Sequence, residues 1–151
     1  MSHTFSAPNV HQVFDWLWTS GQPSETDLRA IADLGTGTVV NLALPTSSNA
    51  LPGEAEMVAN LGMNYFHIPV EWQAPTPENL ADFFRLMDAF RGPPLWVHCA
   101  LNMRVSAFVY LYRRLRLGED DAAARRVMDQ VWTPDAVWSA YIADALGRGS
   151  P

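Results

Sequence analysis

Short apolar runs alternate along the chain with longer stretches in which apolar residues recur every three or four positions. The runs "TVVNLAL" (38–44), "NYFHIPV" (64–70) and "LWVHC" (95–99) are rich in apolar and β-branched residues. Such runs are typical of buried strands in a parallel sheet. In "VFDWLWTSGQP" (13–23), apolar and polar positions partly alternate, which predicts one further strand that ends at Gly21 and Pro23.

The stretches between these runs have the spacing and the end signals of helices. Ser24 is a predicted N-cap for a helix that ends at Gly35. Thr76 followed by Pro77 predicts the start of another helix, which ends before "GPP" (92–94). Further helices are expected at about 54–61, from near Arg104 to Gly118 with one apolar stripe, at about 119–131, and after the cap "TPD" at 133–135.

Strands that alternate with helices predict an α/β fold of three layers, in which a mostly parallel central sheet is flanked by helices. With 151 residues and no internal repeat or long linker, the chain is expected to form a single domain over 1–151. Its ends, 1–9 and 147–151, are expected to be loose. In such sheets ligands bind beyond the carboxyl ends of the strands, and Cys99 lies at such an end.

Charge and composition narrow the classes of partner. The net charge is −6, so a nucleic-acid or anionic-membrane partner would need a basic patch. The candidate for one is the Arg113, Arg114 and Arg116 cluster, which we interpret as the solvated end of a helix. The one cysteine excludes an intramolecular disulfide, and no segment approaches the roughly 18 apolar residues of a membrane span. We therefore expect a cytoplasmic protein that binds neither nucleic acid nor membrane, and the scattered histidines predict no metal site.

The stretch "LWVHCALNMRVSAF" (95–108) carries the candidate chemistry. Cys99 closes an apolar strand and a helix begins near Arg104, so loop amides and the helix N-terminus create a positive potential that favours a thiolate or a bound phosphate. Arg104 adds a planar fork of donors for two oxygens of a tetrahedral anion, and a ring hydrogen bond from His98 could orient the loop. A thiolate facing an electrophile held by arginine is the arrangement of nucleophilic catalysis. The alternative is that Cys99 is a small buried hydrophobe.

From "WTSGQPSETDLRAIADLGTGTVVNLAL" (18–44) through "YFHIPV" (65–70) to "PLWVHCALNMRVSAF" (94–108), the sequence resembles the cysteine-dependent protein tyrosine and dual-specificity phosphatases, especially their small bacterial members. The resemblance implies an α/β fold, a cysteinyl-phosphate intermediate and no metal or other cofactor. The family loop has His-Cys, five residues, Arg and then Ser or Thr, with glycine three residues after the cysteine. The resemblance further implies a nucleophile and a phosphate-binding set: Cys99 attacks, and His98, Ala100, Leu101, Asn102, Met103 and Arg104 form the loop.

The loop of this chain departs from the family pattern. Only four residues separate Cys99 from Arg104. Asn102 stands where the glycine would be, and Val105 directly follows the arginine. Asparagine tolerates left-handed backbone angles, so we expect the turn to survive. One residue of a helix is about 100° of rotation and 1.5 Å of rise, and a misplacement of about 1 Å can cost about a hundredfold in rate. We therefore expect phosphate binding to survive better than turnover.

Two further residues match roles that the resemblance implies. Glu71, in "IPVEWQAPTPEN" (68–79), is the candidate general acid for the leaving oxygen, because this segment contains no aspartate. Its alternative is a solvated loop carboxylate. Ser106 is the candidate hydroxyl that hydrogen-bonds the leaving thiolate, and its alternative is a helix-surface serine bonded to a carbonyl one turn back. Trp72 either walls the pocket or packs on the core.

The predicted function is hydrolysis of a phosphomonoester, either a phosphorylated protein side chain or a small phosphate. The loop side chains Ala100, Leu101 and Met103 add no positive charge, so a highly phosphorylated inositol lipid is less favoured. One alternative is a catalytically weak or silent phosphate-binding module. Another is a rhodanese-like sulfurtransferase, whose cysteine loop has about this shorter length. The physiological substrate and the oligomeric state stay open.

Overall fold

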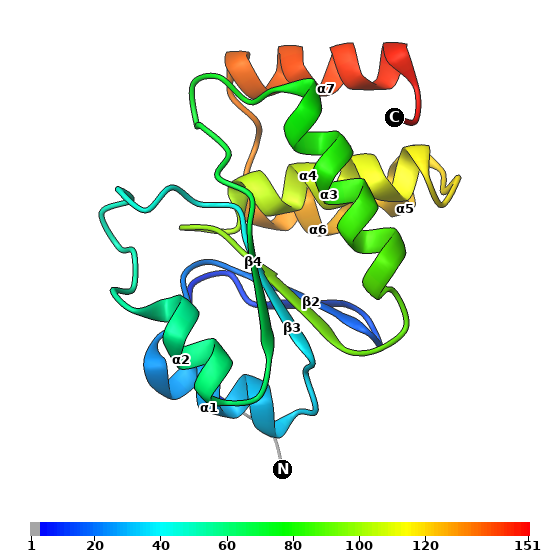
Figure 1. Ribbon diagram of the computed structural model, residues 1–151. Helices are drawn as coiled ribbons and strands as arrows, with labels where there is room; N and C mark the ends of the chain where they lie inside the picture. Colours follow the sequence, from blue (N-terminus) through cyan, green and yellow to red (C-terminus); the bar gives the residue numbers. More distant parts are fainter. Residues whose placement is uncertain (1–3) are drawn as a thin grey trace.

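The computed structural model describes residues 4–151 and confirms the α/β class (Figure 1). A sheet of five strands has the order β1-β2-β5-β3-β4. All neighbouring strands are parallel except β1, which pairs antiparallel with β2 at one edge. The strands are β1 (His11–Phe14), β2 (Leu17–Ser20), β3 (Thr38–Asn41), β4 (Asn64–His67) and β5 (Leu95–His98).

Helices cover both faces of the sheet, which makes the three predicted layers (Figure 1). The face with two helices holds α1 (Glu25–Asp33) and α2 (Glu54–Asn60). The other face holds α3 (Pro77–Phe90), α4 (Met103–Leu115), α5 (Asp121–Ala124), α6 (Arg126–Val131) and α7 (Ala136–Arg148). The predicted caps Ser24 and Thr76 are confirmed, because each side chain accepts a hydrogen bond from the backbone amide three residues later.

Two predicted elements are wrong in the same way, because each is interrupted. The single strand expected within 13–23 is a hairpin, in which a turn at Asp15 and Trp16 joins β1 to β2; aspartate is a favourable turn residue. The helix expected at 119–131 is divided into α5 and α6 at Arg125. The side chain of Asp120 accepts a bond from the Ala123 amide and so starts α5 later than expected.

The core lies on both sides of β5, with successive side chains on opposite faces. Leu95 and Val97 belong to the large apolar cluster under α3–α7, whereas Trp96 belongs to the cluster under α1 and α2. The single apolar stripe expected on the helix after the cysteine loop is wrong, because α4 is buried on all sides from Arg104 to Tyr112. This helix lies against the sheet and also contacts α3, α6 and α7.

Parts of both predicted loose ends make contacts with the rest of the chain, while residues 1–3 lie outside the described residues. Ser6 and Ala7 donate three hydrogen bonds to the carboxylate of Asp27 at 2.9 Å. Burial raises the pKa of Asp27, but the hydrogen bonds from Ser24 and Ser6 outweigh it and leave that pKa below its ordinary value. At the other end, Gly147 and Arg148 belong to α7. The side chain of Arg116 binds the last two residues, Ser150 and Pro151.

The arginine cluster at the end of α4 does not form a free basic patch. Arg113 pairs with Glu119, Arg114 with Asp121, and Arg116 with Asp88. Each positive charge therefore has a carboxylate beside it, which weakens any attraction for polyanions. Within residues 4–151, no helix combines the length and apolar character needed to cross a bilayer.

Candidate active site

Cys99 lies directly after β5, where the parallel strands β2, β3 and β5 end side by side. The register places Ser20 and Asn41 on either side of His98, the residue before the cysteine. The thiol residue is buried, with 1% of its surface exposed, and lines a pocket of about 200 Å³. The other residues that line this pocket are Trp72, Ala100, Leu101, Met103 and Arg104. Cys99 and three of the four loop residues therefore line one cavity.

Asn102 adopts the left-handed backbone conformation that the sequence predicts at this position, with φ of 67°. It is the N-cap of α4, but its side chain does not cap the helix. Its amide nitrogen instead donates to the carbonyl of Asn9 at 2.7 Å and to the hydroxyl of Thr19 at 3.1 Å. The first amides of α4 are thus left for another acceptor.

The carbonyl oxygens of residues 99–102 are all bound by donors of the protein. These donors are His98 Nδ1 for Cys99, Gln22 N and Asn49 Nδ2 for Ala100, Asn9 Nδ2 for Leu101, and Ser106 N for Asn102. The N–H and C=O groups of a trans peptide point in opposite directions, and residues 4–151 contain no cis peptide. The amides of residues 100–103 therefore point away from these donors. Those of 100, 101 and 103 have no acceptor within the described chain, so they can bind an oxyanion.

Gly21 allows the loop to be held this closely. A Cβ atom on Gly21 would lie 2.5 Å from the carbonyl oxygen of Ala100 and 2.4 Å from Cγ of Pro8. The Gly21 amide donates to the Pro8 carbonyl at 2.7 Å, and the next amide, from Gln22, donates to Ala100 at 3.0 Å. A side chain at position 21 would therefore push the loop away from the chain segment that orients it.

Arg104, in the first turn of α4, extends into the same pocket as Cys99. Its Nη1 donates to the carbonyl of Val70 at 2.9 Å, and its guanidinium carbon lies 5.8 Å from the centre of the Trp72 ring. Its Nε is buried and has no hydrogen-bond partner within residues 4–151. A buried donor without an acceptor costs about 1–3 kcal/mol, which an anion in the pocket would relieve.

Trp72 satisfies both interpretations of its role, because it lines the pocket and packs on the core. Its ring lies 5.3 Å from that of Trp132 and 5.7 Å from that of Trp138, measured between centroids. Nε1 of Trp138 also donates to the backbone carbonyl of Trp72 at 2.9 Å. The segment that contains Glu71 and Trp72 is therefore anchored to α7.

Glu71 and Ser106, the two other candidate residues, lie in different surroundings. Glu71 is exposed and does not line the pocket, although it precedes Trp72, which does. Ser106 is buried, so it is not a helix-surface residue. Its hydroxyl donates to the carbonyl of Met103 at 2.8 Å and accepts from Nε1 of Trp132 at 3.0 Å. The catalytic roles of Glu71 and Ser106 stay predictions, and that of Ser106 requires its hydroxyl to leave Met103.

Asn9, Asn49 and Glu54 contact the loop or its flanking histidine, and the sequence did not predict these contacts. Asn9 and Asn49 hold loop carbonyls, and the buried Glu54 contacts His98 at 2.5 Å. None of the three has a local signal, because each contact joins segments that are distant in sequence. Within the described residues, no group of three histidine, cysteine or carboxylate side chains is arranged to hold a metal ion.

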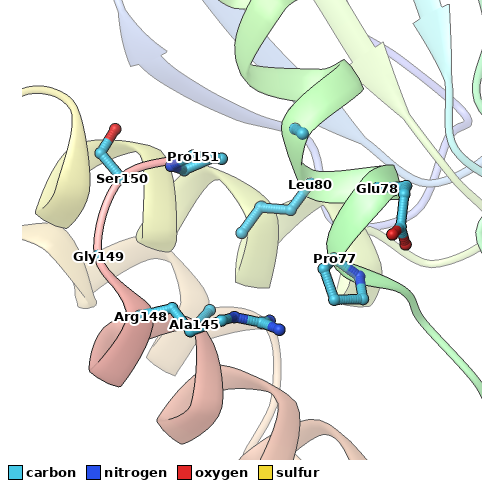
Figure 2. Close-up of a pocket in the computed structure, with 9 residues that line it drawn as sticks. Pro77, Glu78, Leu80, Ala145, Arg148, Gly149, Ser150 and Pro151 are labelled. Carbon is cyan, nitrogen blue, oxygen red and sulfur yellow. The ribbon is translucent and has the colours of Figure 1, made fainter.

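A separate pocket of about 290 Å³ lies between the start of α3 and the end of α7 (Figure 2). Pro77 and Leu80 line it from α3, and Arg148 and Pro151 line it from the C-terminal side. It has neither cysteine nor histidine in its lining and shares no lining residue with the Cys99 pocket. Of these two pockets, only the one that Cys99 lines therefore contains residues of the predicted site.

Known proteins resemble the chain in sequence and in structure. The family model described as "DSP-PTPase phosphatase fused to NAD+ Kinase" matches residues 7–136. A DUF442 protein from Shewanella putrefaciens CN-32, whose name gives phosphatase as its suspected activity, is 31% identical, with a TM-score of 0.84 over 96% of this chain and 93% of its own. No curated protein is significantly similar to the chain.

Two more distant solved structures share the fold. Tk-PTP in its active form is 20% identical, with a TM-score of 0.73 over 93% of this chain and 95% of its own. Pseudomonas aeruginosa TpbA, in complex with phosphotyrosine, is 20% identical, with a TM-score of 0.73 over 91% of this chain and 84% of its own. At this identity the likeness shows that the architecture is common to the three proteins.

Proposed function

The chain belongs to the family described as "DSP-PTPase phosphatase fused to NAD+ Kinase", and we propose that it hydrolyses phosphomonoesters through a cysteinyl-phosphate intermediate. One observation carries the proposal. The thiol of Cys99, the unpartnered Nε of Arg104 and the free amides of the loop share one pocket. These are a nucleophile and a set of donors for the oxygens of a single phosphoryl group.

In the first step, the Cys99 thiolate attacks phosphorus while Arg104 and the loop amides hold the non-bridging oxygens. The S–P bond forms and the bond between phosphorus and the leaving oxygen breaks. The leaving oxygen takes the electron pair and a proton, for which Glu71 is the proposed donor. Support for Glu71 is its position next to Trp72, which lines the pocket. A short movement of this segment would be required, because Glu71 is exposed.

In the second step, water attacks phosphorus, passes a proton to the carboxylate of Glu71, the proposed donor of the first step, and the S–P bond breaks. Inorganic phosphate leaves and the thiolate is restored, with Ser106 as the proposed donor of a hydrogen bond to the sulfur. The shortened loop offers one amide fewer than the family loop. Since Asn102 preserves the turn and the amides of residues 100, 101 and 103 are free, phosphate binding should be less affected than turnover.

The pocket favours an apolar leaving group. Apart from Arg104, its lining contains no charged side chain, and Leu101 and Trp72 form apolar walls. Leu101 is 44% exposed, which places it where a substrate would enter. An aryl phosphate such as phosphotyrosine fits this lining, whereas a substrate with several phosphates would find no further positive charge. The complex of P. aeruginosa TpbA with phosphotyrosine is in line with this substrate class.

The proposal is tested with an aryl phosphate at mildly acidic pH. We expect the purified protein to release phosphate, and Cys99→Ser to lose this activity while it still binds phosphate through Arg104 and the loop amides. Rapid acid quench should trap a phosphorylated wild-type protein. Equal rates in wild type and variant would refute the proposal. Phosphate binding without turnover in wild type would favour the silent binding module, and sulfur transfer from thiosulfate would favour the sulfurtransferase.

A further inference from the structure

A buried carboxyl–imidazole pair lies directly behind the phosphate-binding loop. Oε2 of Glu54, the first residue of α2, is 2.5 Å from Nε2 of His98, the last residue of β5. Their side chains are 5% and 0% exposed. His98 points to the α1 and α2 face of the sheet, as Trp96 does, because alternate residues of a strand share a face. The pair therefore lies behind the loop, outside the pocket that Cys99 lines.

Both ring nitrogens of His98 face an oxygen. Nδ1 is 3.2 Å from the carbonyl of Cys99, which can only accept, so Nδ1 carries a hydrogen. The contact between Nε2 and Glu54 requires a second hydrogen between them. The pair therefore holds two hydrogens and has no net charge, whichever partner carries the shared one. The pair therefore acts on the loop by fixing its geometry more than through an electric field.

Gln22 connects the same pair to the loop by a second route. Its side-chain amide donates to Oε1 of Glu54 at 2.8 Å, while its backbone amide donates to the carbonyl of Ala100 at 3.0 Å. A neighbouring titratable group on β4 is Tyr65, whose pKa is raised by burial to about 12, against the lowering effect of its hydrogen bond with Asn41. Tyr65 therefore stays neutral at working pH, and Glu54 has His98 and Gln22 as its partners.

We propose that Glu54 is a positioning residue of the phosphatase reaction. Through His98 it fixes the peptide between Cys99 and Ala100, so that the thiol and the Ala100 amide face the same phosphoryl group. The Nδ1 bond holds the Cys99 carbonyl on one side of this peptide, which directs the Ala100 amide to the other. The inference rests on the proposed function, but its effect on phosphate binding can be measured without turnover.

Two substitutions separate position from charge. Glu54→Gln keeps the length of the side chain: its amide nitrogen can donate to Nε2 while Nδ1 keeps its hydrogen. Glu54→Asp keeps the charge but is one methylene shorter, so it cannot reach His98 without movement. We expect kcat/KM of Glu54→Gln within about threefold of wild type and that of Glu54→Asp lower by roughly tenfold or more, because small misplacements in an active site are costly. Glu56→Asp, an exposed change on the same helix, should have no effect.

The second readout is the NMR resonance of the His98 Nδ1–H proton. If Glu54 only stabilised the fold, this resonance would not have to change in the variants. It should persist in Glu54→Gln and disappear or broaden in Glu54→Asp. Phosphate affinity should also be close to wild type in Glu54→Gln and lower in Glu54→Asp. Because this holds even if the wild-type protein hydrolyses no substrate, failure of this inference can be distinguished from failure of the proposed function. Equal behaviour of the two variants, or greater damage in Glu54→Gln, would overturn it.

Discussion

Helices α3 and α4 begin in opposite ways. At α3, the hydroxyl of Thr76 accepts from the Asn79 amide, the side chain of Asn79 accepts from the Thr76 amide, and Pro77 has no amide to satisfy. At α4, Asn102 turns its side chain to Asn9 and Thr19 and leaves the first turn uncapped. One helix satisfies its end with its own side chains, and the other has no side-chain cap for its first amides.

The contrast between the two helix starts indicates how a ligand site can be recognised. A missing cap costs a helix about 1 kcal/mol, so an uncapped start persists only where other contacts compensate. At α4 the compensation is burial on all sides and the bonds that Asn102 makes elsewhere. An uncapped start with an unpartnered buried Arg104 beside a cysteine therefore indicates an anion site more strongly than any of the three features alone.

The largest effect should come from replacing Arg104, in the uncapped first turn of α4. In Arg104→Lys, one ammonium replaces a guanidinium that bonds Val70 through Nη1 and still has Nε free. We expect kcat/KM to fall by about a hundredfold or more, because lysine cannot reproduce the planar fork. Steady-state kinetics with an aryl phosphate measure this. Arg113→Lys on the same helix, away from the pocket, is the matched control, and an equal loss there would contradict the assignment.

A smaller effect is expected from the segment that orients the loop. Gly21→Ala places a Cβ atom 2.5 Å from the Ala100 carbonyl, which forces the loop or the Pro8 segment to move. Phosphate affinity and kcat/KM should each fall roughly tenfold, since the loop amides turn with that peptide. Gly37→Ala is the control, because nothing lies within 4 Å of its added atom and its φ is not positive. If both variants bind phosphate as wild type does, the close approach is not required.

The smallest effect on catalysis is expected at the capped start of α3. Thr76→Ala removes the cap of α3 and should lower the free energy of unfolding by about 1 kcal/mol. Its kcat/KM should stay at the wild-type value, because the amides of α3 do not contact substrate. Thr133→Ala is a matched control, since Thr133 also precedes a proline but the cap of α7 is Asp135. Urea denaturation gives the stabilities, and a loss of activity in Thr76→Ala would show that the two helix starts are not independent.

The sequence predicts the features whose signals are local. Ser24 and Thr76 mark helix starts by residue type alone, and both helices were confirmed. Cys99 and Arg104 stand out because they lie five positions apart at a strand end, and the structure brings them to one pocket. The left-handed turn at Asn102 follows from asparagine's own backbone preference.

What the sequence does not predict depends on distant parts of the chain. The hairpin turn at Asp15 and Trp16 was missed, because the apolar pattern continues across it. Glu54 reaches His98 across 44 positions, and Asn9 reaches Leu101 across 92. Before folding, these are ordinary polar residues of loops or helix ends. Local periodicity contains no information about such contacts, because the crossovers of the parallel sheet create them.

The long span of these anchors affects the order in which the site forms during synthesis. Asn9 and Asn49 leave the ribosome long before the loop carbonyls that they bind. Trp138, which holds the Trp72 segment, follows later still. At translation rates of about 5–20 residues per second, the nascent chain exists for seconds before the loop and its anchors are all present. The sulfur of Cys99, the proposed nucleophile, is thus made before the groups that would direct it to a substrate.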